Sequence, residues 1–170
     1  MYNFTKKYCY IPGITLILLC CAANYLDAQE SISVSGSWSE TIDVTDLTGG
    51  PGSDLNSTYT SASNVVYHSI SSSSYRLWES WDWRVDVRRS DINWDSRFQL
   101  YVRRSSNGIG FGSISGGTAY QLISTSDQQF YTGTYHRYLV GCQFELRNVS
   151  VQIPADDYTT TVIYTITDTS

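Results

Sequence analysis

The sequence predicts an all-β protein, in which a single antiparallel β-sandwich follows an N-terminal signal peptide. The first observation is a two-residue alternation of apolar and polar residues, as in the run from Trp81 to Arg88, where Trp and Val alternate with Asp and Arg. The second is that no comparable segment shows helical spacing. Strands with one buried face and one wet face have this period, and many short strands between turn-rich tracts are typical of sandwiches. We therefore expect an immunoglobulin-like or jelly-roll-like sandwich.

Residues 1–28 are predicted to be a secretory signal peptide. Lys6 and Lys7 form a basic start, and residues 11–23 form an apolar run that suits the core of such a leader but is too short to span a bilayer comfortably. We place the cleavage after Ala28, because the polar, alternating part of the chain follows it, with Ala23 as the alternative. The chain is therefore expected to be secreted or displayed at the cell surface.

The predicted mature domain, residues 29–170, is long enough to form one domain with a substantial core. Leader removal takes Lys6 and Lys7 from the 11 basic residues and Asp27 from the 16 acidic ones, so nine Arg stand against 15 acidic residues. A net charge near −6 argues against nucleic acid or an anionic membrane as the partner. We expect no membrane insertion of the mature chain.

Cysteine usage excludes a disulfide within the mature domain. Three of the four cysteines precede residue 29, which leaves Cys142 alone. A lipoprotein leader ending at Cys20 or Cys21 is disfavoured, because the bulky pair Leu18-Leu19 stands where small residues are needed. Cys142 lies on the apolar face of an alternating run and is expected to be a buried small hydrophobe.

The alternation also predicts the individual strands and the core. We expect strands at 31–38, 40–46, 62–70, 80–89, 97–104, 117–124, 128–133, 137–147, 149–153 and 157–167. The predicted core consists of the inward residues of these runs: Trp81, Trp83, Val85, Phe98, Leu100, Val140, Phe144, Val162 and Tyr164.

Residues 29–63 could form a semi-detached N-terminal arm. The stretch 46–63 is rich in Gly, Ser and Thr, and is either a flexible connector or a surface excursion. Two alternatives are open for the segment from Ser31 to Val44: it folds as the first strands of its own sandwich, or it is donated as a strand to the sheet edge of another copy. The sequence favours the intrachain alternative slightly.

Catalytic chemistry has little support. His68 and His136 are the near-neutral acid-base candidates, and neither lies in a recognisable nucleophile or metal motif. His68 is expected on the polar face of its strand. The tract Gly108–Gly112 is not followed by a helical pattern, so we interpret it as a β-arch or bulge and not as a phosphate loop. We expect no catalytic residue, no cofactor and no enzyme activity.

One weak candidate exists for a metal site. Asp91, Asn93 and Asp95 have the oxygen spacing of the start of a calcium loop. Ser96 replaces the turn glycine, and Val102 stands where a bidentate Glu would complete the shell. We therefore expect an Asx-rich hairpin turn and no metal.

A candidate glycan site lies just before the alternation of residues 81–88. Tyr75 and Trp78 precede the regular pattern, and an exposed indole could stack on a sugar ring. Trp81 and Trp83 share a face with two valines and are expected in the core.

The C-terminal run, residues 153–168, resembles the closing strand of secreted surface β-sandwiches, namely WxL-type cell-surface domains and archaic chaperone-usher pilins of the spore-coat-U type. The shared features are a turn at Pro154, a Tyr-Thr start at Tyr158 and an alternating Thr/aliphatic strand. The chain departs from these families: Trp83-Arg84-Val85 is its nearest approach to the paired WxL signature, and Thr169 stands where usher pilins carry a Tyr. The resemblance implies a surface, adhesive or fibre-subunit role.

From these observations we expect an exported structural or adhesive protein that acts at the cell surface through protein partners or self-assembly. A carbohydrate-binding module that uses its exposed aromatic residues is the alternative. The sequence leaves open the ligand or partner, the oligomeric state and the topology of the sandwich.

Overall fold

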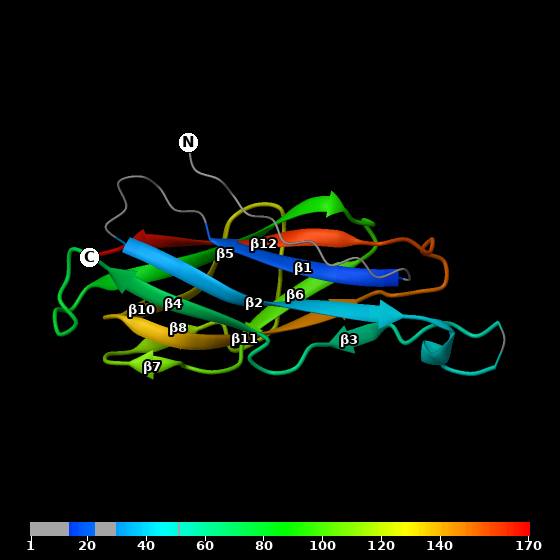
Figure 1. Cartoon of the computed structure of the whole chain (residues 1–170), viewed down its shortest axis with the longest axis horizontal. Coiled ribbons are helices and arrows are strands. Elements are labelled where there is room, and N and C mark those ends of the chain that lie inside the picture. Colours follow the sequence, from blue (N-terminus) through cyan, green and yellow to red (C-terminus); the bar gives the residue numbers. More distant parts are fainter. Residues whose placement is uncertain (1–13, 23–29, 51) are drawn as a thin grey trace.

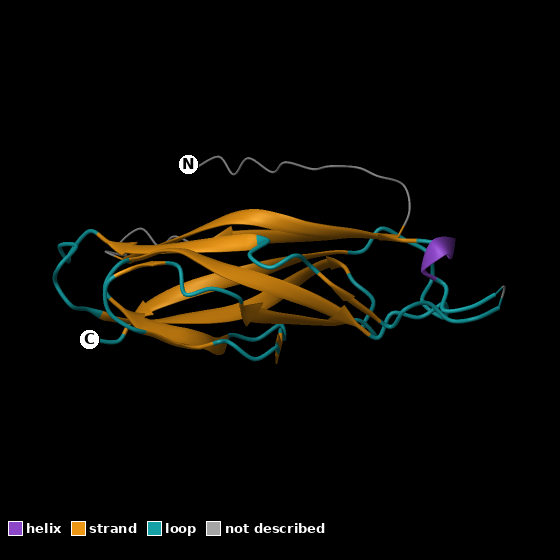
Figure 2. Cartoon of the chain, turned by 90° about the horizontal axis from the view of Figure 1, so that it is seen from below, coloured by secondary structure: helices purple, strands orange, loops and turns teal. Residues whose placement is uncertain are grey.

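The computed structural model describes residues 14–22, 30–50 and 52–170. These residues form two largely antiparallel β-sheets packed against each other, with an elongated outline (Figures 1 and 2). The predicted all-β sandwich is thus confirmed, and the only helical turn in the described residues is the 3-10 turn η1, Val44–Asp46. The other residues of the predicted leader, 1–13 and 23–28 with both cleavage points, lie outside the described residues.

The first sheet contains six strands. Their order is β8 (Ile114–Gly116), β10 (Gln128–Thr134), β5 (Asp82–Asn93), β12 (Thr159–Asp168), β1 (Ile14–Ala22) and β2 (Glu30–Ile42). Neighbours are antiparallel except β1 and β12, which run parallel.

The second sheet begins with β2 again, because this long strand takes part in both sheets. The order is β2, β4 (Val66–Ser72), β11 (Arg137–Arg147), β6 (Gln99–Arg104) and β9 (Gln121–Leu122), while β3 (Thr58–Thr60) and β7 (Ile109–Gly110) also pair with β11. Residues 30–36 of β2 pair with β4, and residues 37–42 pair with β1. Gly36 ends the first half with φ +104°, and a Cβ there would overlap the carbonyl of Val65, so the crossing needs glycine.

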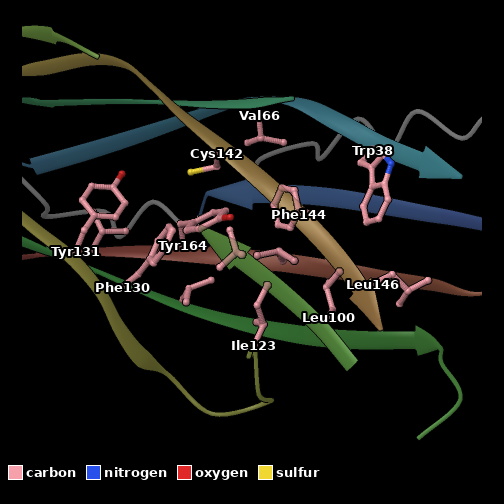
Figure 3. Packing of buried hydrophobic residues seen from close by; sticks show 14 of the residues in the cluster. Trp38, Val66, Leu100, Ile123, Phe130, Tyr131, Cys142, Phe144, Leu146 and Tyr164 are labelled. Atoms are coloured by element: carbon pink, nitrogen blue, oxygen red, sulfur yellow. The ribbon is translucent and has the colours of Figure 1, made fainter. Parts of the chain in front are cut away.

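The core lies between the two sheets and contains the residues expected from the alternation. All nine predicted core residues are at most 5% exposed, and Cys142 is fully buried as predicted. The rings of His68 on β4 and Tyr164 on β12 lie 4.0 Å apart between centroids, which joins the two sheets at mid-core. Figure 3 shows Cys142, Phe144, Tyr131 and Tyr164 in this layer.

Four predicted strands differ from the structure by more than their ends. The expected strands 31–38 and 40–46 are one continuous strand, β2, followed by η1, where Asp43 caps the turn and ends the ladder. The expected strand 117–124 contains only the two residues of β9, because Gly116 and Gly117 both have positive φ and turn the chain. Residues 149–153 are a turn, which closes through the bond from the amide of Ile153 to the carbonyl of Ser150.

The tract 46–63 is a surface excursion pinned to the sandwich. Leu47 pairs with Leu55, which is buried, and Asp54 accepts a hydrogen bond of 2.9 Å from the amide of Val151. Within the chain, residues 30–36 of β2 pair with its own β4, and exchange of the Ser31–Val44 segment between copies stays a prediction.

Candidate functional site

The strand β1 lies between β2 and β12 and connects them (Figure 1). Its residues 14–19 pair with Ile42–Ser37 of β2, and its residues 17–22 pair with Thr159–Tyr164 of β12. Ile17, Leu18 and Leu19 therefore pair on both sides at once. We call this strand position, between residues 37–42 of β2 and 159–164 of β12, the β1 slot.

The two flanks of the β1 slot depend on β1 to different degrees. β12 pairs along its whole length with β5 on its other side, so its place in the sheet is fixed without β1. Residues 37–42 of β2 have no ladder partner except β1 among the described strands. Loss of β1 would leave this half of β2 attached only through buried side chains.

Buried side chains of both flanks line up along the β1 slot. Trp38 and Ile42 of β2 are 5% and 2% exposed, and Val162 and Tyr164 of β12 are fully buried. The indole Nε1 of Trp38 donates to the Glu40 carboxylate at 3.2 Å, which satisfies the only polar atom of that side chain. The β1 slot is therefore bounded by the backbone edges of β2 and β12, and these four buried side chains along the edges are apolar. We call these four side chains the apolar seat.

The nine residues of β1 lie entirely within the segment that the sequence predicts as a cleaved leader. Sequence reasoning missed their pairing because an apolar run of this length has no period that distinguishes a buried strand from the core of a signal peptide. The one available signal was the presence of two Ile and one Thr in the run, which is compatible with a strand.

The predicted sugar-stacking residues lie in different environments. Tyr75 stacks on the buried Trp81, with ring centroids 5.6 Å apart and planes 6° from parallel, so one face of its ring is covered. Trp78 is 70% exposed, at a turn closed by the bond from the amide of Glu79 to the carbonyl of Arg76. The Arg76 guanidinium lies 5.8 Å from the Trp78 ring centroid. Trp78 alone is thus freely displayed.

The predicted calcium-loop residues are used for internal contacts. Asp91 accepts hydrogen bonds from Arg89 and from the Thr160 hydroxyl, and Asn93 ends β5 and donates to the Asp157 carbonyl at 2.8 Å. Asp95 pairs with Arg97, which lowers the pKa of its carboxyl to about 2. Within the described ranges no three acidic, His or Cys side chains gather as metal ligands do.

The prediction for His68 was wrong, because this side chain is fully buried. In β4 the inward residues are Val66, His68, Ile70 and Ser72, so the alternation of Val66 and Ile70 could have placed it. The Tyr131 hydroxyl lies 2.7 Å from its Nδ1, and the Cys142 sulfur lies 3.8 Å from the same atom. A Cys next to a His resembles a nucleophile pair, but both groups are closed off from solvent.

His136 lies at the edge of this interior and also makes internal contacts. Its Nδ1 accepts a hydrogen bond from the amide of Ser72 at 3.4 Å, and its Nε2 lies 3.1 Å from the carbonyl oxygen of Tyr75. The ring therefore anchors the turn that carries Trp78.

The tract Gly108–Gly112 forms a tight arch that wraps the buried guanidinium of Arg137. This group donates to the carbonyls of Gly110, Phe111 and Gly112 at 3.2, 2.9 and 2.8 Å. A Cβ at Gly110 would overlap the carbonyl of His136, so the glycine permits a close backbone approach.

Comparison with known proteins finds no match: no family model, no curated protein and no solved structure is similar to the chain. Among residues 14–22, 30–50 and 52–170, no helix has the length and apolar character needed to cross a membrane.

Proposed function

We propose that this chain is an exported structural or adhesive protein, of the kind that forms fibres or surface layers, and that it acts at the cell surface through protein contacts made at the β1 slot. The observation that carries the proposal is the position of β1. A segment that the sequence predicts to be removed during export is the strand that pairs with both β2 and β12.

Leader removal would expose N–H and C=O groups along residues 37–42 of β2 and 159–164 of β12. Such edges pair readily with an extended segment of another chain, in which main-chain hydrogen bonds give affinity and side-chain seats give specificity. The apolar seat formed by Trp38, Ile42, Val162 and Tyr164 supports this mode of contact.

The experiment has two parts, performed in the organism that makes the protein. Antibody labelling of intact cells and N-terminal mass spectrometry should find a surface protein that begins within residues 24–29. A photo-reactive amino acid in place of Ser39, an exposed residue of β2, should then cross-link the processed chain to another protein. The matched control is Thr125, which is exposed in a loop that β5 and β12 separate from the slot. An intracellular chain, or equal cross-linking at Thr125 and Ser39, contradicts the proposal.

The second candidate is a carbohydrate-binding module, and it is favoured by the exposure of Trp78. A solvent-facing indole offers a flat apolar face on which a sugar ring can stack. The half-covered ring of Tyr75 weakens this candidate, because it leaves one open aromatic face where a platform needs several. We therefore rank it second.

A further inference from the structure

We infer that Ile14–Ala22 is a placeholder strand, and that cleavage of the leader is the step that opens the β1 slot to an extended, alternately apolar segment of a partner protein. This inference rests on the proposed function and adds its regulation. In the uncleaved chain the leader strand fills the β1 slot and completes the sheet. In the processed chain the β1 slot is empty.

The spacing of strands makes the slot a real gap once β1 is removed. Hydrogen-bonded strands lie about 4.8 Å apart, so two strands that share a middle neighbour lie about 10 Å apart. Where Ile17–Leu19 lie between them, residues 37–39 of β2 and 159–161 of β12 could therefore not bond to each other without one of them moving by about one strand width, although some Cα atoms of β2 and β12 already lie within 8 Å of each other. β12 is held by β5 and the first half of β2 is held by β4, and both constraints oppose such a closure.

The composition of β1 indicates a temporary occupant. Of its even-numbered positions, 14, 18, 20 and 22 pair with the buried residues Ile42, Trp38, Val162 and Tyr164, and position 16 pairs with the half-buried Glu40. Its odd-numbered positions pair with residues that are not buried, among them Ser37 and Ser39 of β2, yet they include Ile17 and Leu19. A permanent strand would carry mainly polar residues in that second row, as β12 does with Thr159, Thr161 and Thr165 beside the single apolar Ile163. An apolar residue at nearly every position is instead what a leader needs for export.

The same register defines the segment that replaces β1. It runs parallel to β12 and antiparallel to β2, because these are the directions of the two edges. It carries apolar side chains at every second residue, opposite Trp38, Val162 and Tyr164. The residues between them are free to be polar, because they pair with Ser37, Ser39 and Thr161. A leader carries apolar residues at these intermediate positions, whereas a segment of a secreted partner can carry polar ones.

The experiment uses the full chain with a protease site inserted between Ala22 and Glu30. The probe is a synthetic peptide of residues 14–22 in which Ala replaces Cys20, Ser replaces Cys21, Thr replaces Ile17 and Leu19, and two Arg are added for solubility. Before the cut, a fluorescent form of this peptide should not bind. After the cut and removal of the leader fragment, it should bind, and a scrambled peptide should bind at least tenfold more weakly.

Hydrogen–deuterium exchange reports on the two edges directly. We expect the amides of residues 37–42, and those of 159–164 that face away from β5, to exchange at least tenfold faster after leader removal, and the peptide should restore their protection. Residues 99–104 of β6 pair with β11 and β9 far from the slot and should stay unchanged. Equal protection before and after removal overturns the inference, as does peptide binding to the uncut chain.

If the cut chain aggregates, a variant of the uncut chain tests the same inference. Leu18 pairs with both Trp38 and Thr160, and proline there cannot donate to the ladder and disrupts the strand. Leu18→Pro in the uncut chain should speed exchange at both edges and allow the peptide to bind, while Leu18→Val should change neither. If Leu18→Pro leaves both edges protected, the leader does not hold the slot closed.

These results separate the inference from the proposed function. Surface labelling and cross-linking test whether the processed protein acts at the cell surface through the slot. Exchange and peptide binding test whether the leader occupies the slot beforehand. A surface protein that cross-links through Ser39 but shows no change in exchange on leader removal would contradict only the placeholder role.

Discussion

The hydroxyl of Tyr131 on β10 lies 2.7 Å from Nδ1 of His68 on β4, so a polar contact joins the two sheets inside the hydrophobic core. Both side chains are fully buried. Burial lowers the pKa of His68 to about 3 and raises the pKa of Tyr131 well above its ordinary value. Both groups are therefore neutral in the folded protein at physiological pH, which an apolar interior requires.

This contact predicts a dependence of stability on pH. An unfolded His68 takes up a proton below about pH 6.5, whereas the folded one stays neutral down to about pH 3. Between these values the unfolded state binds more protons, so the free energy of unfolding falls by about 1.4 kcal/mol for each unit by which the pH is lowered. Above about pH 6.5 His68 adds no slope. Urea unfolding at several pH values should show this slope and its loss in His68→Gln. Equal slopes in both proteins would contradict the prediction, because carboxyl groups such as Asp95 contribute equally to each.

The hydroxyl of Tyr131 should itself stabilise the fold. Tyr131→Phe leaves a buried ring nitrogen of His68 without this partner, and we expect a loss of about 1–3 kcal/mol in the free energy of unfolding. Tyr101→Phe is the matched control, since its half-buried hydroxyl donates to Gln99 at 3.1 Å near solvent. That variant should lose less than about 1 kcal/mol. Similar losses for both variants would show that the buried Tyr131 hydroxyl stabilises the fold no more than the half-buried Tyr101 hydroxyl does.

Much of the sandwich could be predicted from the sequence because its strands alternate with the period of two that burial of one face imposes. The central strands β5 and β11 follow this rule, and their inward residues Trp83, Val85 and Phe144 are fully buried as expected. The edge elements could not be predicted in the same way. β7 and β9 have two residues each, and such short ladders depend on the neighbouring strand more than on their own sequence.

The candidate site was the least predictable part, for a physical reason. The β1 slot is a relationship between residues 14–22 and two strands from opposite ends of the chain, and no local pattern reports such a pairing. Local patterns did indicate the environment of Trp78, which is exposed, but not that of Tyr75, whose ring is held by the distant contact with Trp81.

The packing of β10 on β5 predicts a clash at Gly133. A methyl group at this position would overlap the buried ring of Trp83, whose indole Nε1 donates to the carbonyl of Tyr135 at 2.7 Å and so resists displacement. Gly133→Ala should therefore reduce the free energy of unfolding by about 1–3 kcal/mol. Gly50→Ala, in a loop with open space around it, should change it by less than about 0.5 kcal/mol. Chemical denaturation of the two variants compares them, and an unchanged Gly133→Ala would mean that Trp83 can move.

A chain that begins at Thr60 distinguishes the two roles considered for the N-terminal arm. It lacks β2, whose residues Ile32, Trp38 and Ile42 are buried and whose first half pairs with β4. We expect such a chain to aggregate, with little native signal in near-ultraviolet circular dichroism, because the core would be open to water. A folded monomer that cannot assemble would instead favour donation of this arm between chains.

Replacement of Trp78 decides between protein contact and glycan binding. The side chain is 70% exposed and supports no core packing, so Trp78→Ala should change the free energy of unfolding by less than about 0.5 kcal/mol. If the protein acts through the β1 slot, a glycan array should show no binding that depends on Trp78, and cross-linking from Ser39 should be unchanged in the variant. Phe111→Ala is the matched control, because Phe111 is 72% exposed in the glycine arch. A glycan retained by the unchanged protein and by Phe111→Ala, but not by Trp78→Ala, would rank the carbohydrate-binding module first, since only a specific aromatic stack explains that difference.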